Sequence, residues 1–266
     1  MFCEEYRLDQ FAHGLEEGES PVRLRCYARA RTGLLADDGN RWAVLILPGG
    51  AYRRISPAES EPVALAFVAA GVQAFVLDYS VLPARWPRQF LEAAAAMAFL
   101  RKRAEAFGFS PDALAVCGFS AGGHLAGCLA NLWRHPVIEA RLGLSPHQVR
   151  PDAAILGYPV IHHEQTIRDV AGEEADGALY LERSVTGRNP PTFLWATAAD
   201  ASVPPENTLD YAASLRRAGV PLELHLFSDG PHAMGLADRE SARDEAHCNP
   251  HAANWFPLCA QWLKGL

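Results

Sequence analysis

The chain has 266 residues, of which 49% are hydrophobic and 21% are charged, and its formal net charge at pH 7 is −7. This length suffices for one large α/β domain or two small ones. The charges are dispersed along the chain, which excludes the basic face of a nucleic-acid-binding protein. Because no apolar run is long enough to cross a bilayer, we expect neither nucleic acid nor a membrane as a partner.

The N-terminus and the cysteines favour a cytoplasmic protein. Residues 1–20 (MFCEEYRLDQFAHGLEEGES) are acidic and mixed, without the basic-then-apolar order of a signal peptide. The cysteines form no CxxC pair; they are Cys3, Cys26, Cys117, Cys128, Cys248 and Cys259. We expect reduced thiols, with disulfides as the alternative.

The first element expected along the chain is an antiparallel edge strand at 22–29, where apolar and polar residues alternate (VRLRCYAR). From about residue 42 onward, short apolar runs alternate with longer helical patterns. The apolar runs predict buried strands within 41–50, 72–80, 113–119, 153–159, 192–198 and 222–228. The helical patterns lie at 57–71, 88–108, 121–133, 205–218 and 253–264. This alternation indicates an α/β fold with a mostly parallel sheet of about seven or eight strands, covered by helices on both faces.

We expect a single domain over residues 1–266 without a large cap domain, because the sequence contains no internal repeat, low-complexity segment or linker. Residues 160–190 interrupt the alternation: they are polar, acidic and longer than an ordinary connection. Long irregular insertions in compact domains tend to be lids or binding loops. We therefore predict a short lid-like insertion there.

One serine lies in a motif typical of a nucleophile. Residues Gly118 to Gly122 read GFSAG and match G-x-S-x-G, between a predicted strand and a predicted helix. In that context the serine takes a strained backbone that exposes its hydroxyl, and the flanking glycines avoid collisions with the neighbouring strand and helix. The alternative is a packed turn in which Ser120 is a helix N-cap. The strand before it and the helix after it favour the nucleophile.

A serine hydroxyl needs a base, and the base needs a group that orients it. In this architecture the partners follow in the order serine, acid, histidine, each just beyond a strand. Asp200 follows the next-to-last predicted strand and His232 follows the last one. Asp200 would hold the imidazole and His232 would transfer the proton. Alternatively, Asp200 caps the next helix, His232 is a surface residue, or Asp229 is the acid.

The tetrahedral intermediate also needs donors for its oxyanion. One is expected to be the backbone N–H of Ala121, directly after the nucleophile. The other is expected from the loop PGGAY (48–52), where either Gly50 or Ala51 could donate. A plain tight turn is the alternative for this loop.

Gly49, Tyr52 and His124 are further candidates for the substrate pocket, although packing alone would also explain His124. No spaced ligand set accompanies the pair His162-His163, so we predict no metal site. Neither GxxxxGK[ST] nor GxGxxG occurs, and we predict no cofactor.

Three stretches of the chain resemble the small carbohydrate acetyl esterases of the α/β-hydrolase superfamily, which are related to acetyl-xylan esterases. The matching stretches are 47–81, 114–127 and 190–238. The resemblance implies the α/β-hydrolase fold and a triad of Ser120, Asp200 and His232, with the PGGAY loop where related esterases have HGGG. Pro48 and Ala51 depart from HGGG, but no catalytic group is missing.

We therefore expect a serine hydrolase that cleaves short-chain esters through an acyl-enzyme, and the resemblance suggests acetyl groups on sugars. The partner would be a small ester substrate. A peptidase, formamidase or lactone hydrolase with the same triad is the alternative enzyme. A non-catalytic carbohydrate-binding relative is a further alternative, with Trp86 or Trp133 stacking on sugars. The sequence leaves the oligomeric state open, including a homo-oligomer.

Overall fold

Eight strands form one sheet in the computed structural model, which describes residues 2–10, 15, 22–30, 33, 41–171 and 177–266. The strands are β1 (Phe2–Arg7), β2 (Arg23–Ala28), β3 (Ala43–Leu47), β4 (Gln73–Asp78), β5 (Leu114–Phe119), β6 (Ala153–Gly157), β7 (Thr192–Thr197) and β8 (Leu222–Phe227). Their order in the sheet is β1-β2-β4-β3-β5-β6-β7-β8. Strands β3 to β8 pair in parallel, whereas β2 is antiparallel to both of its neighbours.

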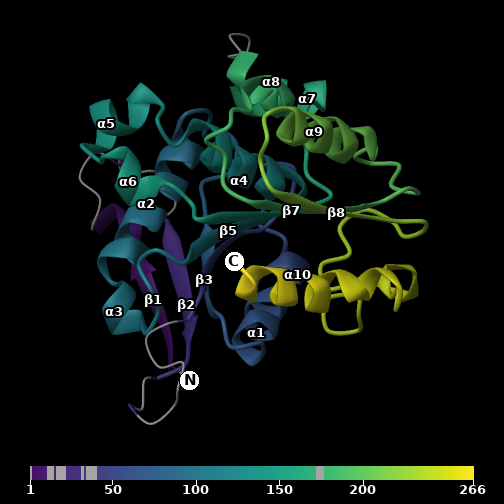
Figure 1. Ribbon diagram of the computed structural model, residues 1–266, viewed down its shortest axis with the longest axis horizontal. Coiled ribbons are helices and arrows are strands. Elements are labelled where there is room, and N and C mark those ends of the chain that lie inside the picture. Colours follow the sequence, from purple (N-terminus) through teal and green to yellow (C-terminus); the bar gives the residue numbers. More distant parts are fainter. Residues whose placement is uncertain (1, 11–14, 16–21, 31–32, 34–40, 172–176) are drawn as a thin grey trace.

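Both faces of the sheet are covered by helices (Figure 1). The main covering helices are α1 (Glu61–Ala69), α2 (Arg88–Lys102), α4 (Ser120–Leu132), α9 (Glu206–Arg217) and α10 (Trp255–Lys264). Helices α1 and α10 lie on one face, and α2, α4 and α9 on the other. In β3, Leu45 and Leu47 join the hydrophobic cluster of one face, while Val44 and Ile46 join that of the other. Burial on both sides is the reason why the strand reads as a continuous apolar run.

The predicted architecture is confirmed: the sheet is mostly parallel, has eight strands in the described residues and carries helices on both faces. The prediction that 22–29 forms the edge strand is wrong. This segment contains β2, which is antiparallel as expected, but β1 covers its outer side. Three of the six residues of β1 (FCEEYR) are charged, so no apolar run marks this strand in the sequence. Charge is common on edge strands because it discourages pairing with other chains.

The helix expected over 88–108 is shorter than predicted, because α2 ends at Lys102 and a separate turn, α3 (Ala104–Phe107), follows. The N–H of Arg103 hydrogen-bonds to the carbonyls of both Phe99 and Leu100, which tightens the last turn of α2. Gly108, with a φ of 72°, then ends α3.

The segment between β6 and β7 contains α7 (Glu164–Ala171), the 3₁₀ turn η3 (Gly177–Leu179) and α8 (Leu181–Ser184). Residues 172–176 of the predicted insertion lie outside the described residues. Helix α7 buries Ile167 and Val170 against the body of the protein. Its Asp169 carboxylate pairs with Arg53, at 2.6 Å, on the loop after β3. The lid-like role of this insertion stays a prediction.

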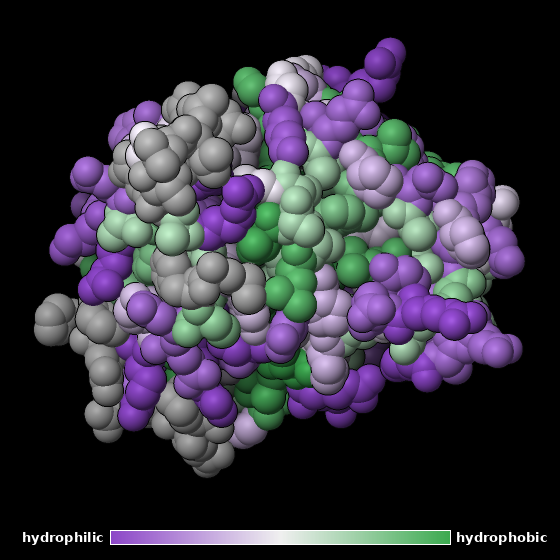
Figure 2. All heavy atoms as spheres, turned by 90° about the horizontal axis from the view of Figure 1, so that it is seen from below, coloured by the Kyte–Doolittle hydropathy of each residue, from purple (hydrophilic) through white to green (hydrophobic). Residues whose placement is uncertain are grey.

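The remaining short elements are α5 (Pro136–Leu142), α6 (Pro146–Val149), η1 (Leu8–Gln10), η2 (Pro57–Glu59), η4 (Glu245–His247) and η5 (Ala252–Asn254). Figure 2 shows the underside of the molecule as drawn in Figure 1: hydrophobic side chains gather near its middle, with hydrophilic ones around them. In the part of the chain that the structure describes, no helix is both long and apolar enough to span a membrane.

Candidate active site

Ser120 lies at the turn from β5 into α4 and has a φ of 54°. This left-handed conformation is costly for a residue with a side chain, and the strain predicted for this serine is therefore present. The N-cap of α4 is Phe119, and no side chain caps the helix. The N-cap alternative for Ser120 is wrong, because its hydroxyl is hydrogen-bonded to His232 instead.

The glycines on either side of Ser120 permit close packing around the turn. A Cβ on Gly122 would lie 2.0 Å from the carbonyl oxygen of Leu47, at the end of β3. A Cβ on Gly118 would lie 2.2 Å from the carbonyl oxygen of Gly122. The start of α4 therefore rests directly on the backbone of two strands, and only glycine fits at these positions.

Two further loops bring His232 and Asp200 to the serine. His232 Nε2 lies 2.7 Å from Ser120 Oγ, and His232 Nδ1 lies 2.6 Å from Asp200 Oδ2. A carboxylate only accepts hydrogen bonds, so Nδ1 carries the proton and Nε2 is free to accept the proton of the serine hydroxyl. The three residues expected from their sequence positions thus form a continuous chain of hydrogen bonds.

Asp200 is held rigidly at the end of β7. It is 4% exposed, and its Oδ1 accepts hydrogen bonds from the backbone N–H groups of Ser202 at 2.9 Å and Val203 at 3.0 Å. The N-cap of α9 is Pro205, so Asp200 is not the cap of that helix. Asp229, the alternative acid, is exposed and contributes its carbonyl to Asn249.

The loop that carries His232 is fixed from two sides. Thr197, at the end of β7, donates its hydroxyl to the carbonyl of Gly230 at 2.7 Å. The indole N–H of Trp255 in α10 donates to the carbonyl of Gly235 at 3.0 Å. These bonds hold the imidazole close to Ser120 without help from a substrate.

Ser120 and His232 line a cavity of about 1020 Å³. Its wall includes Gly50 and Ala51 of the oxyanion loop (residues 48–52), and also Ala121. Within the described residues, the N–H groups of Gly50 and Ala51 donate no hydrogen bond, and Ala121 lies in the first turn of α4, where N–H groups lack an intrahelical partner. All three predicted oxyanion donors therefore border the cavity of the serine, with unused N–H groups in the oxyanion loop.

The other three pocket candidates lie behind the cavity wall rather than on it. Tyr52 and His124 are both 1% exposed, and the Tyr52 hydroxyl is 2.8 Å from His124 Nδ1. His124 Nε2 is 2.9 Å from the carbonyl oxygen of Leu179, so Nε2 carries the proton and Nδ1 accepts. The backbone N–H of Gly49 donates a hydrogen bond to the Glu59 carboxylate. The packing explanation of His124 is confirmed, whereas the prediction that the three residues line the substrate pocket is wrong. Tyr52 and His124 instead connect the oxyanion loop, α4 and the insertion through hydrogen bonds.

Sequence reasoning missed two buried polar residues beside the serine. Glu59 of η2 is 0% exposed, and its carboxylate accepts hydrogen bonds from the Gly49 N–H at 2.7 Å and from the Tyr158 hydroxyl at 2.8 Å. Tyr158, just after β6, packs its ring edge against the His232 ring, with the centroids 5.0 Å apart. A glutamate in a polar turn normally faces solvent, so the sequence contained no signal of its burial.

Of the histidine pair considered for a metal, His163 lines the cavity of Ser120. No group of three or more His, Cys, Asp or Glu side chains in the described ranges could hold a metal ion. Trp133 is buried, and Trp86 stacks on Phe90 with ring centroids 4.8 Å apart. Neither tryptophan lines the cavity of Ser120.

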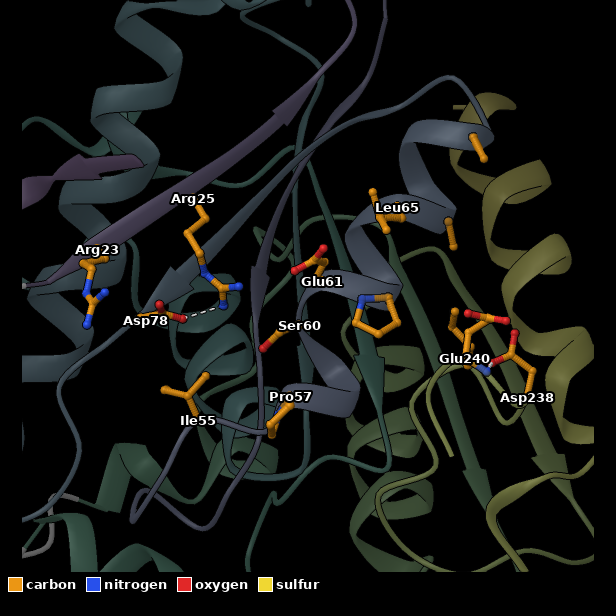
Figure 3. A pocket seen from close by; sticks show the side chains of 14 residues that line it. Arg23, Arg25, Ile55, Pro57, Ser60, Glu61, Leu65, Asp78, Asp238 and Glu240 are labelled. Carbon is orange, nitrogen blue, oxygen red and sulfur yellow. Dashed lines mark hydrogen bonds and ion pairs between the residues drawn. The ribbon is translucent and has the colours of Figure 1, made fainter. Parts of the chain in front are cut away.

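A second hollow lies on the other side of η2 and α1 (Figure 3). Of the 14 residues that line it, seven are apolar, among them Ile55, Pro57 and Leu65, and seven are polar or charged. An ion pair between Arg25 and Asp78, 2.7 Å apart, lies at one end. Pro57 borders both hollows, so η2 forms the wall between them.

Comparison with known proteins gives the same fold. Residues 44–236 match the family described as "alpha/beta hydrolase fold". An acetyl ester-xyloside bifunctional hydrolase from Caldicellulosiruptor lactoaceticus is 31% identical with a TM-score of 0.82, over 98% of this chain and 96% of that one. A carboxylesterase from Lactobacillus plantarum is 27% identical with a TM-score of 0.86, over 100% of this chain and 98% of that one.

Two curated relatives are longer proteins. Endo-1,4-beta-xylanase B from Butyrivibrio fibrisolvens is 33% identical over 217 residues, which are 77% of this chain and 34% of that protein. The acetylxylan esterase from Xylanibacter ruminicola is 25% identical over 209 residues, which are 73% of this chain and 41% of that protein. The chain therefore spans about a third and about two fifths of the lengths of these relatives.

Proposed function

Since this chain belongs to the α/β-hydrolase family, we propose that it is a serine carboxylesterase that hydrolyses acetyl and other short-chain esters, with acetylated sugars as the substrate class. The observation that carries this proposal is the hydrogen-bonded chain from Asp200 through His232 to Ser120 at the wall of a cavity. Solved relatives named as an acetyl ester-xyloside hydrolase and a carboxylesterase support the ester class, and the relative named as an acetylxylan esterase supports the sugar acetates.

In the proposed mechanism, Ser120 Oγ attacks the ester carbonyl while His232 Nε2 takes the hydroxyl proton. Asp200 stabilises the imidazolium that forms and keeps the ring oriented. The N–H groups of Ala121 and of Gly50 or Ala51 hydrogen-bond to the developing oxyanion. His232 returns the proton to the leaving alcohol, and then activates the water that releases the acid.

We expect a burst of nitrophenol when p-nitrophenyl acetate is mixed with the enzyme, because nitrophenol leaves during acylation and the acyl-enzyme accumulates when its hydrolysis is the slower step. Replacing Ser120 by alanine should lower kcat by roughly 10⁵- to 10⁶-fold, since the nucleophile is lost. The measurement is stopped-flow absorbance, together with labelling of the wild type by a fluorophosphonate and identification of the labelled residue. Unchanged turnover in Ser120→Ala, or labelling at another residue, would contradict the assignment.

The substrate class is tested separately with three groups of compounds at equal concentration: acetylated xylose and xylo-oligosaccharides, aryl formamides, and proline peptides. Acetate release from the sugars at a higher kcat/KM than from the other two groups is the expected outcome. A preference for formamides or peptides would contradict esters as the substrate class. The assignment of Ser120 as nucleophile would stand, because the same triad serves several reactions.

A further inference from the structure

Glu59 is a fully buried carboxylate next to the catalytic groups, and the proposed mechanism does not use it. Its two oxygens have different partners: Oε2 accepts the N–H of Gly49, and Oε1 accepts the hydroxyl of Tyr158. The Tyr158 oxygen in turn accepts the N–H of Gly235, at 2.9 Å. This is a continuous chain of hydrogen bonds through the interior.

The chain joins the two loops that the reaction has to align. Gly49 belongs to the oxyanion loop, directly before the two candidate donors, Gly50 and Ala51. Gly235 lies at the end of the histidine loop (residues 229–235), which carries His232. The carboxylate of Glu59 is the group between them, so its position sets the distance from the oxyanion donors to the imidazole.

The hydrogen-bond directions favour an ionised Glu59. Because the Tyr158 oxygen already accepts from Gly235, its own proton points to Glu59, and the Gly49 N–H points to the other oxygen. Burial raises the pKa of Glu59, whereas these two hydrogen bonds, the neighbouring His232 and the Ser56 side chain oppose that rise. The geometry requires two acceptors, which a carboxylate supplies and an amide does not.

The other titratable groups around Glu59 are neutral. Burial raises the pKa values of the Tyr79 and Tyr158 hydroxyls and of the Cys117 thiol, and the Glu59 charge adds to each rise. His232, by contrast, becomes positive during the reaction and faces Asp200, Ser120 and the Tyr158 ring. The cavity of Ser120 is lined by six further titratable side chains, which are Arg53, Arg54, His163, Glu240, Arg243 and His247.

We propose that Glu59 is a positioning residue, which ties the oxyanion loop to the histidine loop and supplies a second negative charge, besides Asp200, beside the His232 imidazolium. The inference rests on the proposed esterase function. Glu59 borders the cavity of Ser120, but its two oxygens are hydrogen-bonded to Gly49 and Tyr158, and it acts on the reaction through these two residues.

The test compares Glu59→Gln and Tyr158→Phe with a matched control, Glu61→Gln, which makes the same charge change at an exposed position two residues away. We expect kcat for p-nitrophenyl acetate to fall about 10- to 100-fold in both test variants, because a small misplacement of catalytic groups has this effect. KM should change less than about threefold, since the cavity wall keeps its shape. The control should retain wild-type kcat.

The pH profile separates this role from a merely structural one. Without the Glu59 charge, the imidazolium that forms during the reaction loses one of its two neighbouring negative charges. The acid limb of kcat/KM should move down by about one pH unit in Glu59→Gln. In Tyr158→Phe, which retains the Glu59 charge, it should move less.

Wild-type activity and fluorophosphonate labelling of Ser120 are measured first, so that failure of the esterase function is recognised independently. If the wild type is active and both folded variants match Glu61→Gln in kcat and in the acid limb, the proposal is overturned. If Glu59→Gln does not give a native circular dichroism spectrum, Tyr158→Phe decides, because it removes one oxygen and retains the ring. A wild-type kcat in Tyr158→Phe would then refute the proposal that Glu59 positions the oxyanion loop relative to the histidine loop.

Discussion

The protonation of His124 is set by its two partners and by complete burial. The carbonyl of Leu179 can only accept, so His124 Nε2 carries its proton, and Nδ1 accepts from Tyr52. Burial disfavours the charged ring and lowers its pKa from 6.5 to about 4. His124 is therefore neutral in the folded protein at any pH at which the enzyme would be assayed.

This shift predicts a specific acid sensitivity. Between about pH 6.5 and pH 4 the unfolded chain binds a proton on His124 that the folded chain does not, so stability rises with pH and is lost on acidification. Lowering the pH from about 7 to about 4.5 should remove roughly 2–3 kcal/mol through this residue. Urea unfolding of the wild type and of His124→Gln, which cannot titrate there, measures it. Equal losses in both proteins would contradict the prediction.

At the scale of elements, the active site depends on how closely α4 approaches β3. The first turn of α4 supplies Ser120 and Ala121, and β3 leads directly into the oxyanion loop. Gly122 of α4 packs against the carbonyl of Leu47 in β3, and no side chain would fit between them. One helix–strand contact therefore aligns Ser120 with the backbone N–H groups that we propose as oxyanion donors.

Replacing Gly122 by alanine should therefore disturb both stability and catalysis. The added methyl group would lie 2.0 Å from a backbone oxygen, which cannot move aside without shifting β3. We expect a loss of about 1–3 kcal/mol in unfolding free energy and a lower kcat for p-nitrophenyl acetate. The control is Gly177→Ala, where no atom of the described residues lies within 4 Å of the new Cβ, and a change within about 0.5 kcal/mol is expected. Similar stabilities for the two variants would show that α4 can move away from β3.

At the scale of the whole molecule, packing of the helices against the sheet buries most of the cysteines. All six are free thiols; Cys3 is exposed and Cys248 is partly exposed, while the other four are buried. Burial raises the pKa of the interior thiols, for example those of Cys117 and Cys259, and a protonated thiol is a poor nucleophile. The thiol prediction made from the sequence is confirmed in the structure.

The accessible thiols can be counted. Without added reductant, Ellman's reagent should react readily with the two accessible cysteines of the native protein and with all six after denaturation. The expected ratio follows from burial alone, because the reagent attacks only thiols that it can reach. Fewer than six reactive thiols in denaturant would indicate disulfides and contradict the structure.

The sequence by itself determined the order and type of strands β2 to β8 and of the main covering helices, and the identity of the three hydrogen-bonded residues. Continuous apolar runs reveal strands buried on both faces, and G-x-S-x-G between a strand and a helix identifies Ser120, because both signals are local along the chain. Asp200 and His232 followed from the same rule, since their places after two strands are also visible in sequence.

Only the tertiary structure decided which polar side chains are buried next to Ser120, Asp200 and His232, and which groups they hydrogen-bond to. Tyr52 and His124 read as pocket residues, yet they are buried and bonded to each other, and Glu59 reads as a solvated charge, yet it joins two loops. The edge strand β1 was also missed, because three of its six residues are charged and form no apolar run. Whether a side chain is buried, and which group it hydrogen-bonds to, depends on which segments pack together in the fold. Those segments are far apart in the sequence, so no local sequence pattern reveals the contact.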